Sequence, residues 1–253
     1  MGTFDGKTPP RVVIVTGGSR GIGRSVVERL AADGFAVLFT HSGSDAEAGA
    51  LESGLLGSGR LVRGIRLDVT GDDAPARVFE AAEELGTVTG LVNNAGVTGR
   101  IGPVVDLTDA DLRRVVEVNL VGPVRLCREA ARRWTGPAGG RSIVNVSSVA
   151  ARTGSPYEYV AYAAAKAAVE TLTVGLAKEL AAGGVRVNAV SPGTVDTTIH
   201  ARAGEPGRAG RVASRIPLGR PGRPQEIADA VSWLMSDGAS YVTGAVVEVS
   251  GGL

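Results

Sequence analysis

Short apolar runs rich in valine and isoleucine alternate with longer segments rich in alanine, leucine, glutamate and arginine along the whole chain. The apolar runs lack the apolar–polar alternation of a half-exposed strand, so they are typical of strands buried on both faces of a parallel sheet. The pattern predicts seven strands, at residues 11–16, 36–40, 61–67, 90–93, 142–146, 185–190 and 245–249. It predicts helices between them, at residues 22–33, 46–56, 72–85, 109–134, 162–182 and 224–236.

No linker interrupts this alternation, which predicts one α/β domain over residues 1–253, a doubly wound, seven-stranded parallel sheet with helices on both faces. Residues 1–10 are expected to be a flexible N-terminus. The second helix is the weakest expectation, because residues 48–59 contain four glycines, which disfavour a helix interior. The Pro-, Gly- and Arg-rich stretch 197–224 is interpreted as a substrate lid within the domain, since irregular segments of that length are usually functional or disordered.

The composition of the 253-residue chain excludes several classes of protein. Hydrophobic residues make up 43% of it and the net charge is +1 (27 − 26), so there is enough apolar sequence for a core and little reason to expect disorder. The 37 glycines do not recur at every third position, which excludes a collagen-like chain. A near-neutral charge gives no indication of a nucleic-acid partner.

Targeting and metal-binding features are sparse. No stretch approaches about 18 consecutive apolar residues, and the first residues lack an apolar signal-peptide core, so no membrane span or signal peptide is expected. The one cysteine, Cys127, cannot form an intramolecular disulfide, which fits a cytoplasmic protein, and we interpret it as a buried small residue. His41 and His200 are too few for a metal site, so no metal is expected.

A glycine-rich turn, TGGSRGIG, follows the first expected strand and opens the first expected helix. Gly17, Gly21 and Gly23 permit a tight turn and a close approach of the backbone to a pyrophosphate, and the helix N-terminus offers unpaired N–H groups. The turn is therefore interpreted as a dinucleotide-binding site. An ordinary glycine-rich connection is the alternative.

The end of the second expected strand bears on the kind of dinucleotide. In such sites an acidic residue about 20 positions after the glycines binds the ribose 2′-hydroxyl of NAD. Here the strand ends in Thr40, His41 and Ser42, and the next carboxylate is Asp45. Together with Arg20 in the turn, which could pair with a 2′-phosphate, this favours NADP(H) over NAD(H). The alternative for Arg20 is a solvated surface base.

Tyr162 and Lys166 lie four residues apart in a helical run, so their side chains share one helix face. A nearby ammonium favours phenolate and lowers the pKa of a tyrosine, which suits general acid–base chemistry near neutral pH. The alternative is that Tyr162 packs in the core while Lys166 reaches solvent. Ser147 and Ser148 end the fifth expected strand, at the carboxyl edge where open α/β sheets bind ligands.

These motifs stand in one order: TGGSRGIG, Asp68-Val69, NNAG at 93–96, Asn119, NVSS, YAAAK, the SPG of 191–193 and a closing YVTG…SGG. In this order they resemble the short-chain dehydrogenase/reductase family over residues 11–253, with the nearer likeness to bacterial glucose dehydrogenase-like and 3-oxoacyl-carrier-protein reductase-like members. The resemblance implies a Rossmann-type fold. It also implies hydride transfer between a nicotinamide and a carbonyl or secondary alcohol.

The resemblance implies catalytic roles for four residues. Tyr162 would be the acid/base, and Ser148 would hydrogen-bond the substrate carbonyl. Lys166 would lower the pKa of the tyrosine and hold the nicotinamide ribose. Asn119 would hold a helix distortion and a water that links Lys166 to solvent.

The cofactor site is expected to combine the glycine turn, the end of the second strand and the family positions for the adenine, the ribose and the carboxamide. Its predicted residues are Gly17, Ser19, Arg20, Gly21, Ile22, Gly23, Thr40, His41, Ser42, Asp68, Val69, Asn94, Ala95, Gly96, Tyr162, Lys166, Pro192, Gly193, Val195 and Thr197.

One spacing departs from the family pattern. The family usually has its serine 13 positions before the tyrosine, whereas Ser148 stands 14 before Tyr162 and Ser147 stands 15 before it. We interpret this as one inserted residue within 150–160, a loop that also carries Pro156, Tyr157 and Tyr159. The insertion bears on the substrate side of the site.

The predicted function is an NADP(H)-dependent oxidoreductase of the short-chain type. An NAD-dependent sugar or polyol dehydrogenase and a non-catalytic NADP(H)-sensing regulator are the alternatives. The expected partners are a small-molecule carbonyl or alcohol and further copies of the chain, because the resemblance implies a homotetramer, or a dimer, that uses the fourth and fifth helices.

Some residues remain without a role in this prediction. Trp233 and Leu234 are interpreted as core or subunit packing. The favoured interpretation of the lid arginines is that they are solvated, and attraction of an anionic substrate is the alternative. These arginines are Arg202, Arg208, Arg211 and Arg215.

Overall fold

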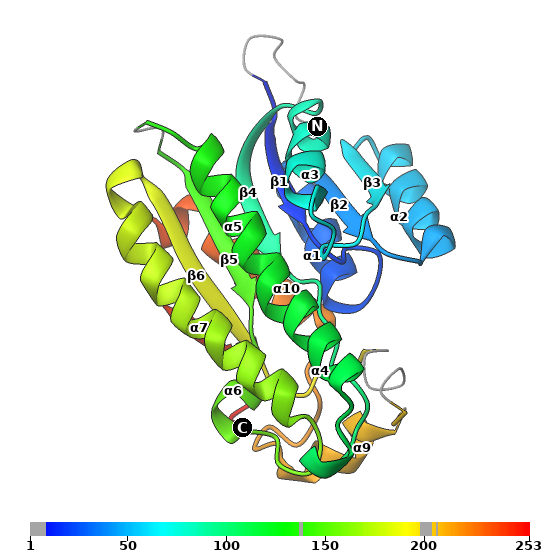
Figure 1. The fold of residues 1–253 in the computed structure, drawn as a ribbon. Coiled ribbons are helices and arrows are strands. Elements are labelled where there is room, and N and C mark those ends of the chain that lie inside the picture. Colours follow the sequence, from blue (N-terminus) through cyan, green and yellow to red (C-terminus); the bar gives the residue numbers. More distant parts are fainter. Residues whose placement is uncertain (1–8, 137–138, 198–203, 206) are drawn as a thin grey trace.

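Seven parallel strands form one sheet in the order β3-β2-β1-β4-β5-β6-β7 in the computed structural model, which describes residues 9–136, 139–197, 204–205 and 207–253 (Figure 1). The strands are β1 Arg11–Val15, β2 Ala36–His41, β3 Val62–Arg66, β4 Thr87–Asn93, β5 Arg141–Val146, β6 Val185–Pro192 and β7 Val246–Val249. The predicted α/β fold with a seven-stranded parallel sheet is confirmed.

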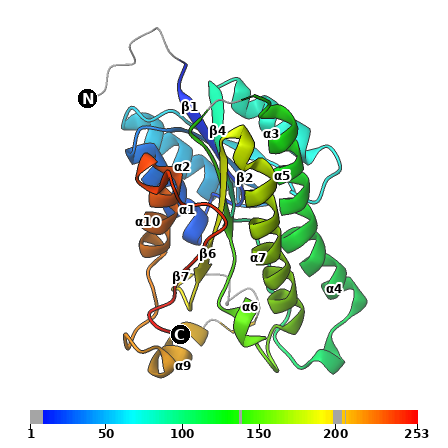
Figure 2. The same cartoon turned by 90° about the vertical axis from the view of Figure 1, so that its left-hand side faces the viewer.

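Helices cover both faces of the sheet (Figure 2). One face carries α1 Gly21–Ala32, α2 Asp45–Gly57 and α10 Pro224–Met235, and the other carries α3 Ala74–Glu83, α4 Asp109–Val116, α5 Gly122–Arg133 and α7 Val160–Leu180. Successive side chains of a strand point to opposite faces, so β1 contributes Val13 and Val15 to one core and Val12 and Ile14 to the other. This double burial explains the continuous apolar runs in the sequence.

The strand order reverses between β1 and β4, which lie side by side although β2 and β3 come between them in the chain. Connections on either side of such a point diverge to opposite faces and leave a crevice at the carboxyl ends of the strands. Phe39 of β2 fixes the glycine turn against this edge, because a Cβ on Gly18 would stand 2.5 Å from the Phe39 Cβ. The turn can therefore rest on β2 only with glycine at that position.

Short elements fill the connections. They are the 3-10 turns η1 Val104–Asp106, η3 Ala181–Gly183, η4 Ala213–Arg215 and η5 Asp237–Ala239, the π-helical turn η2 Glu117–Val121, and the helices α6 Ala150–Thr153 and α9 Arg208–Val212.

Three expectations are corrected or sharpened by the structure. The single helix expected at 109–134 is divided by the π-helical turn η2. The segment 197–224 contains the helix α9 and the turn η4 within its described part, so it is not irregular throughout. The weakly expected second helix forms, and it packs on the core through Ala48 and Leu51, while its glycines Gly49, Gly54 and Gly57 face open space.

One described helical stretch, Val160–Gly183, is long and apolar enough to cross a membrane by length and composition. It comprises α7 and η3, and α7 packs against β5, β6, α4 and α5. Core helices of folded proteins pass the same test, so one such helix is weak evidence for a membrane span.

Candidate active site

A cavity of about 780 Å³ opens at the carboxyl edge of the sheet. Its wall draws on the glycine turn, the ends of β2, β4 and β5, the start of α7 and the segment after β6. Every predicted cofactor residue lines it, as do Ser148, Tyr162 and Lys166. Asn119 is the predicted site residue that does not line it. The structure thus brings together positions separated by up to 180 residues in the chain.

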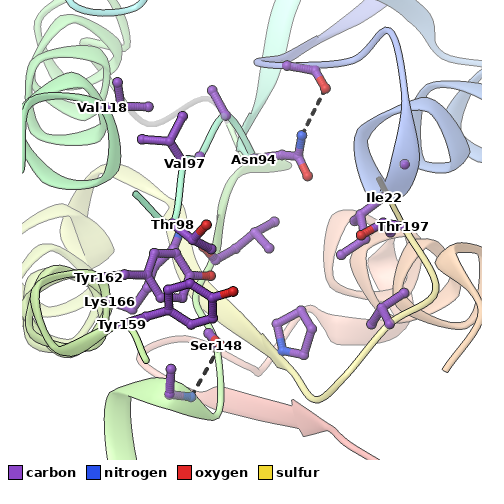
Figure 3. A pocket seen from close by; sticks show the side chains of 18 of the residues that line it. Ile22, Asn94, Val97, Thr98, Val118, Ser148, Tyr159, Tyr162, Lys166 and Thr197 are labelled. Atoms are coloured by element: carbon purple, nitrogen blue, oxygen red, sulfur yellow. Dashed lines mark hydrogen bonds between the residues drawn. The ribbon is translucent and has the colours of Figure 1, made fainter. Parts of the chain in front are cut away.

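The glycine turn presents backbone to this cavity. Gly17 and Gly21 have positive φ angles of 68° and 53°, and a Cβ on Gly23 would stand 2.2 Å from the Gly17 carbonyl oxygen. The side chain of Asn94 fixes the turn by donating to the carbonyls of Thr16 (2.8 Å) and Gly17 (3.1 Å), as Figure 3 shows for Asn94. The N-terminus of α1, a group of unpaired N–H donors, therefore opens on the cavity, which is the arrangement that binds a pyrophosphate.

The end of β2 supplies hydrogen-bonding groups without a carboxylate. Thr40, His41 and Ser42 line the cavity beside Arg20, and Ser44 joins them through a hydrogen bond to the Ser19 hydroxyl. Asp45 is not in the cavity wall. Its carboxylate lies 3.6 Å from His41 Nδ1 and 3.5 Å from Arg66 Nη1. A dinucleotide with a 2′-phosphate would meet a cation and hydroxyl groups in the described wall at this end.

Asp68 follows β3 and is held in one orientation. Its Oδ1 accepts hydrogen bonds from the Thr70 amide (3.0 Å) and hydroxyl (2.9 Å), and its Oδ2 accepts one from Arg114 Nη2 (3.1 Å). Burial raises the pKa of Asp68, but these hydrogen bonds outweigh burial and leave the pKa below its ordinary value. The carboxylate is therefore ionised at neutral pH and can accept a hydrogen bond from a ligand.

Tyr162 and Lys166 point from the first turns of α7 into the cavity, toward Ser148 at the end of β5 (Figure 3). Lys166 is 4% exposed, and its Nζ donates to the Val146 carbonyl (2.6 Å) and lies 5.6 Å from the centre of the Tyr162 ring. Ser148 Oγ accepts a hydrogen bond from the Ala150 amide (3.2 Å), and Ser148 acts to lower the pKa of Tyr162. The predicted constellation is thus assembled in one place.

The pKa values of this pair are set by burial. Burial raises the pKa of Tyr162 to about 12, although the hydrogen bond with Ser148 and the charge of Arg208 oppose the rise. Burial lowers the pKa of Lys166 to about 8. The expectation that Lys166 lowers the pKa of Tyr162 is not met in this structure, because the ammonium donates to Val146 and lies over the ring rather than at the hydroxyl.

Asn119 lies behind the cavity, fully buried in the π-helical turn. Its Nδ2 donates to the Val115 carbonyl (2.8 Å) and to the Val97 carbonyl (2.7 Å), and its Oδ1 accepts from the Val97 amide (3.2 Å). The helix distortion expected at this residue is present. Asn119 ties it to the loop after β4, where a Cβ on Gly96 would stand 2.9 Å from Asn119 Oδ1.

Comparisons with known proteins agree with this geometry. A family model described as enoyl-(acyl carrier protein) reductase matches residues 17–253. The chain is 43% identical to an uncharacterized oxidoreductase, YgfF, of Escherichia coli, over 95% of this chain and 99% of that protein. The chain belongs to the short-chain dehydrogenase/reductase family.

Other members of the short-chain dehydrogenase/reductase family show what the likeness covers. The chain is 42% identical to cis-4-hydroxycyclohexanecarboxylate dehydrogenase of Sinomonas cyclohexanicum (96% of each chain) and 38% identical to 3-oxoacyl-[acyl-carrier-protein] reductase MabA of Mycobacterium tuberculosis (98% and 96%). A short-chain dehydrogenase of Burkholderia cenocepacia, solved in complex with NADP, superposes with a TM-score of 0.88 at 33% identity, over 97% of this chain and 98% of that one. The chain is accordingly an NAD(P)-dependent oxidoreductase.

The loop between α6 and α7, where one inserted residue is expected, has an unusual backbone conformation. Gly154, Ser155 and Tyr157 have positive φ angles of 73°, 43° and 63°, a conformation that costs energy for the two non-glycine residues. The loop bends so that Tyr157 is 81% exposed while Glu158 and Tyr159 line the cavity. This loop therefore places the Glu158 carboxylate and the Tyr159 phenol in the cavity wall, and the inserted residue stays a prediction. Tyr159 was noted in this loop from the sequence, but Glu158 was not.

The sequence favoured solvated lid arginines, but the structure shows that not all of them are solvated. Arg208 and Arg211 form ion pairs with Glu158 and Glu205, and the Arg208 side chain is only 14% exposed. Arg215 is exposed and lines the cavity, while Arg202 and His200 lie outside the described residues.

Several residues that line the cavity belong to no sequence motif and were not predicted as site residues. They include Ser44, Arg114, Arg100 and Arg208. Cys127 is confirmed as a buried residue, since it is 1% exposed and burial raises the pKa of its thiol to about 12. No group of three or more His, Cys, Asp or Glu side chains suited to a metal ion occurs among the described residues, and the absence of a metal stays a prediction.

The buried amine gives a direct pH test, because the chain has just three lysines. We expect one lysine ε signal in the NMR spectrum of ¹³C-lysine-labelled protein to titrate near pH 8 and to be absent in Lys166→Arg. The amine is protonated below that pH and neutral above it, since burial disfavours the charged form. If every lysine signal titrates above roughly pH 10, the value for a solvated amine, the described burial of Lys166 is contradicted.

Proposed function

We propose that the protein is an NADP(H)-dependent carbonyl reductase or alcohol dehydrogenase in which Tyr162 is the proton donor and acceptor. The observation that carries this proposal is the convergence of the Tyr162, Ser148 and Lys166 side chains in the cavity onto which the glycine turn opens. A nicotinamide cofactor, when bound, supplies or accepts the hydride. The glycine turn, Asp68 and the end of β2 would hold its nucleotide part.

The proton chemistry follows from the hydrogen bonds of the chain. With a pKa of about 12, Tyr162 is neutral at pH 7 and can give its proton to a carbonyl oxygen that gains negative charge. Ser148 Oγ accepts from the Ala150 amide, so its own proton is left to donate to the same oxygen. Both features favour reduction of a carbonyl over oxidation of an alcohol near neutral pH.

Lys166 and Asn119 would contribute through their hydrogen bonds to the backbone around the cavity. The Lys166 ammonium, held by the Val146 carbonyl, would hold the nicotinamide ribose of the bound cofactor. Asn119 holds the π-helical turn that shapes the wall beside Gly96. The water expected at Asn119 remains part of this proposal.

The preference for NADP(H) rests on the described wall at the end of β2. Arg20, Thr40, His41 and Ser42 line it and Asp45 does not, so a 2′-phosphate would find donors and no opposing carboxylate. An NAD-dependent sugar or polyol dehydrogenase remains the second candidate. Asp45 is only three residues beyond Ser42, and a carboxylate near this position could bind the ribose 2′-hydroxyl of NAD.

The proposed organisation is a single domain in which the segment 197–224 covers the substrate side. A symmetric homotetramer, or a dimer, is supported by apolar side chains left exposed on neighbouring helices, such as Leu112 of α4, Val124 of α5 and Val174 of α7. Trp233 of α10 is 43% exposed and suits a second contact, whereas Leu234 is fully buried in the core. A cytoplasmic location stays a prediction.

The first test replaces Tyr162 with phenylalanine. We expect Tyr162→Phe to lower kcat/KM for NADPH-linked carbonyl reduction by about 10²- to 10⁴-fold, because the proton donor is removed. The substrates are a panel of small ketones, acyl thioesters, sugars and steroids.

Tyr241→Phe is the control, since that side chain is fully exposed and does not line the cavity. Tyr241→Phe should leave the affinity for NADPH unchanged, and Tyr162→Phe should still bind NADPH. Turnover that survives in Tyr162→Phe would exclude its role as acid/base. NADPH binding without turnover of any substrate by the unmodified protein would favour the sensing regulator.

The second test adds a carboxylate at the end of β2. Ser42→Asp should weaken NADP⁺ binding about 10- to 100-fold and leave NAD⁺ binding nearly unchanged, because like charges would face each other at the 2′-phosphate. Ser53→Asp adds the same charge on exposed α2 outside the cavity and is the control. Calorimetric titration with both nucleotides measures the effect, and tighter binding of NAD⁺ than NADP⁺ by the unmodified protein would overturn the cofactor preference.

A further inference from the structure

The substrate side of the cavity, beyond Ser148 and Tyr162, contains three arginines. Arg100, Arg208 and Arg215 line it, and they come from the loop after β4, from α9 and from η4. The loop after β4 lies against the loop of Glu158, because the Gly102 amide donates to the Glu158 carbonyl (3.1 Å). Three segments distant in sequence therefore direct guanidinium groups to one end of the pocket.

Two of these three arginines have no ion-pair partner among the described carboxylates. Glu158 accepts hydrogen bonds from Arg208 and Arg211, and Glu205 pairs with Arg211, so two glutamates offset two arginines. Arg100 and Arg215 form no ion pair with any described residue. The terminal residue, Leu253, also lines the cavity and makes no ion pair with a described arginine. Asp111 is a further carboxylate of the cavity wall. The substrate side is therefore distinguished by two guanidinium groups without a described carboxylate partner, and not by a net positive charge.

Arg208 is the cation best placed to bind a ligand. Its side chain is 14% exposed, and its guanidinium carbon lies 5.5 Å from the centre of the Tyr159 ring. Nη2 donates to Glu158, while Nε is buried without a hydrogen-bond partner among the described residues and lies 3.9 Å from Glu205 Oε2. Because Nε is buried, a ligand in the cavity cannot reach it, and Nη1, which donates to no described residue, is the donor left for an acceptor there.

The cavity wall that Arg208 shares with the catalytic hydroxyl groups includes apolar groups. Val149, Ala150, Val212 and the Tyr159 ring line it. A ligand that fits these groups has an oxygen at Tyr162 and Ser148, a hydrocarbon part along the wall and an anion at Arg208. A guanidinium binds a carboxylate in a paired, planar geometry.

We propose that the substrate is an oxo acid, or the hydroxy acid formed from it, and that Arg208 binds its carboxylate. Arg100 and Arg215 attract the anion to the mouth of the cavity. This inference rests on the proposed function, because it assigns the reacting oxygen to Tyr162 and Ser148.

The rival explanation is that Arg208 only fastens α9 to the Glu158 loop. Arg211 separates the two explanations, since it pairs with the same two glutamates but does not line the cavity. A purely structural pair would make Arg208→Gln and Arg211→Gln behave alike. A carboxylate-binding residue would make only Arg208→Gln lose discrimination between charged and neutral ligands.

The binding test uses the protein saturated with NADP⁺ and needs no turnover. Calorimetric titration compares cyclohexanecarboxylate with cyclohexanecarboxamide, which has nearly the same shape and no charge. We expect the carboxylate to bind the unmodified protein at least about 10-fold more tightly, and Arg208→Gln to lose about 10- to 100-fold of its affinity for the carboxylate alone. Arg211→Gln should retain the preference. Equal binding of the two ligands, or equal losses in the two variants, would overturn the proposal.

The kinetic test compares reduction of 4-oxocyclohexanecarboxylate with that of its methyl ester. We expect the acid to have the higher kcat/KM, and Arg208→Gln to lower it for the acid and leave the ester nearly unchanged. Equal use of acid and ester, or preferred use of a neutral acyl thioester such as acetoacetyl-N-acetylcysteamine, would contradict the carboxylate site but not the proposed function. Preferential carboxylate binding without reduction of any carbonyl compound would contradict the proposed function but not the carboxylate site.

Discussion

The site depends on one constraint, the parallel pairing of β1 with both β2 and β4 at the centre of the sheet. Because all seven strands run in the same direction, every carboxyl end lies on one edge, and the reversal of strand order at β1 and β4 opens a crevice there. The glycine turn leaves β1, Asn94 follows β4 and Ser148 follows β5. Loss of this pairing would scatter the site even if each local element still formed.

Burial then determines the chemistry of the groups collected at that edge. Lys166 and Tyr162 are shielded from water, so each is driven toward its neutral form, to pKa values of about 8 and about 12. The hydrogen bond from Lys166 to the Val146 carbonyl fixes the position of the amine.

Sequence patterns predicted the sheet and its helices, because continuous valine-rich runs and glycine turns reflect local packing and backbone geometry. The predicted cofactor residues all line one cavity. The patterns failed where the outcome depends on contacts between distant segments. Hydrophobic periodicity predicted one unbroken helix at 109–134, and the distortion at Asn119, which the family resemblance did predict, depends on hydrogen bonds to the distant Val97. The ion pairs of Arg208 need Glu158, whose position depends on a bent loop with positive φ at Ser155 and Tyr157. The pKa of Tyr162 follows from burial, which the spacing to Lys166 does not measure.

The central claim is that this edge of the sheet supports hydride transfer to a carbonyl carbon while the chain supplies the proton. The most direct measurement is mass spectrometry of the alcohol formed from NADPH deuterated at one face of nicotinamide C4, with the ketone that the enzyme reduces fastest. The account predicts one deuterium on the carbinol carbon from one face of the cofactor and none from the other face, in ordinary water. Deuterium in the product from both faces, or a carbinol hydrogen that comes from solvent, would contradict it.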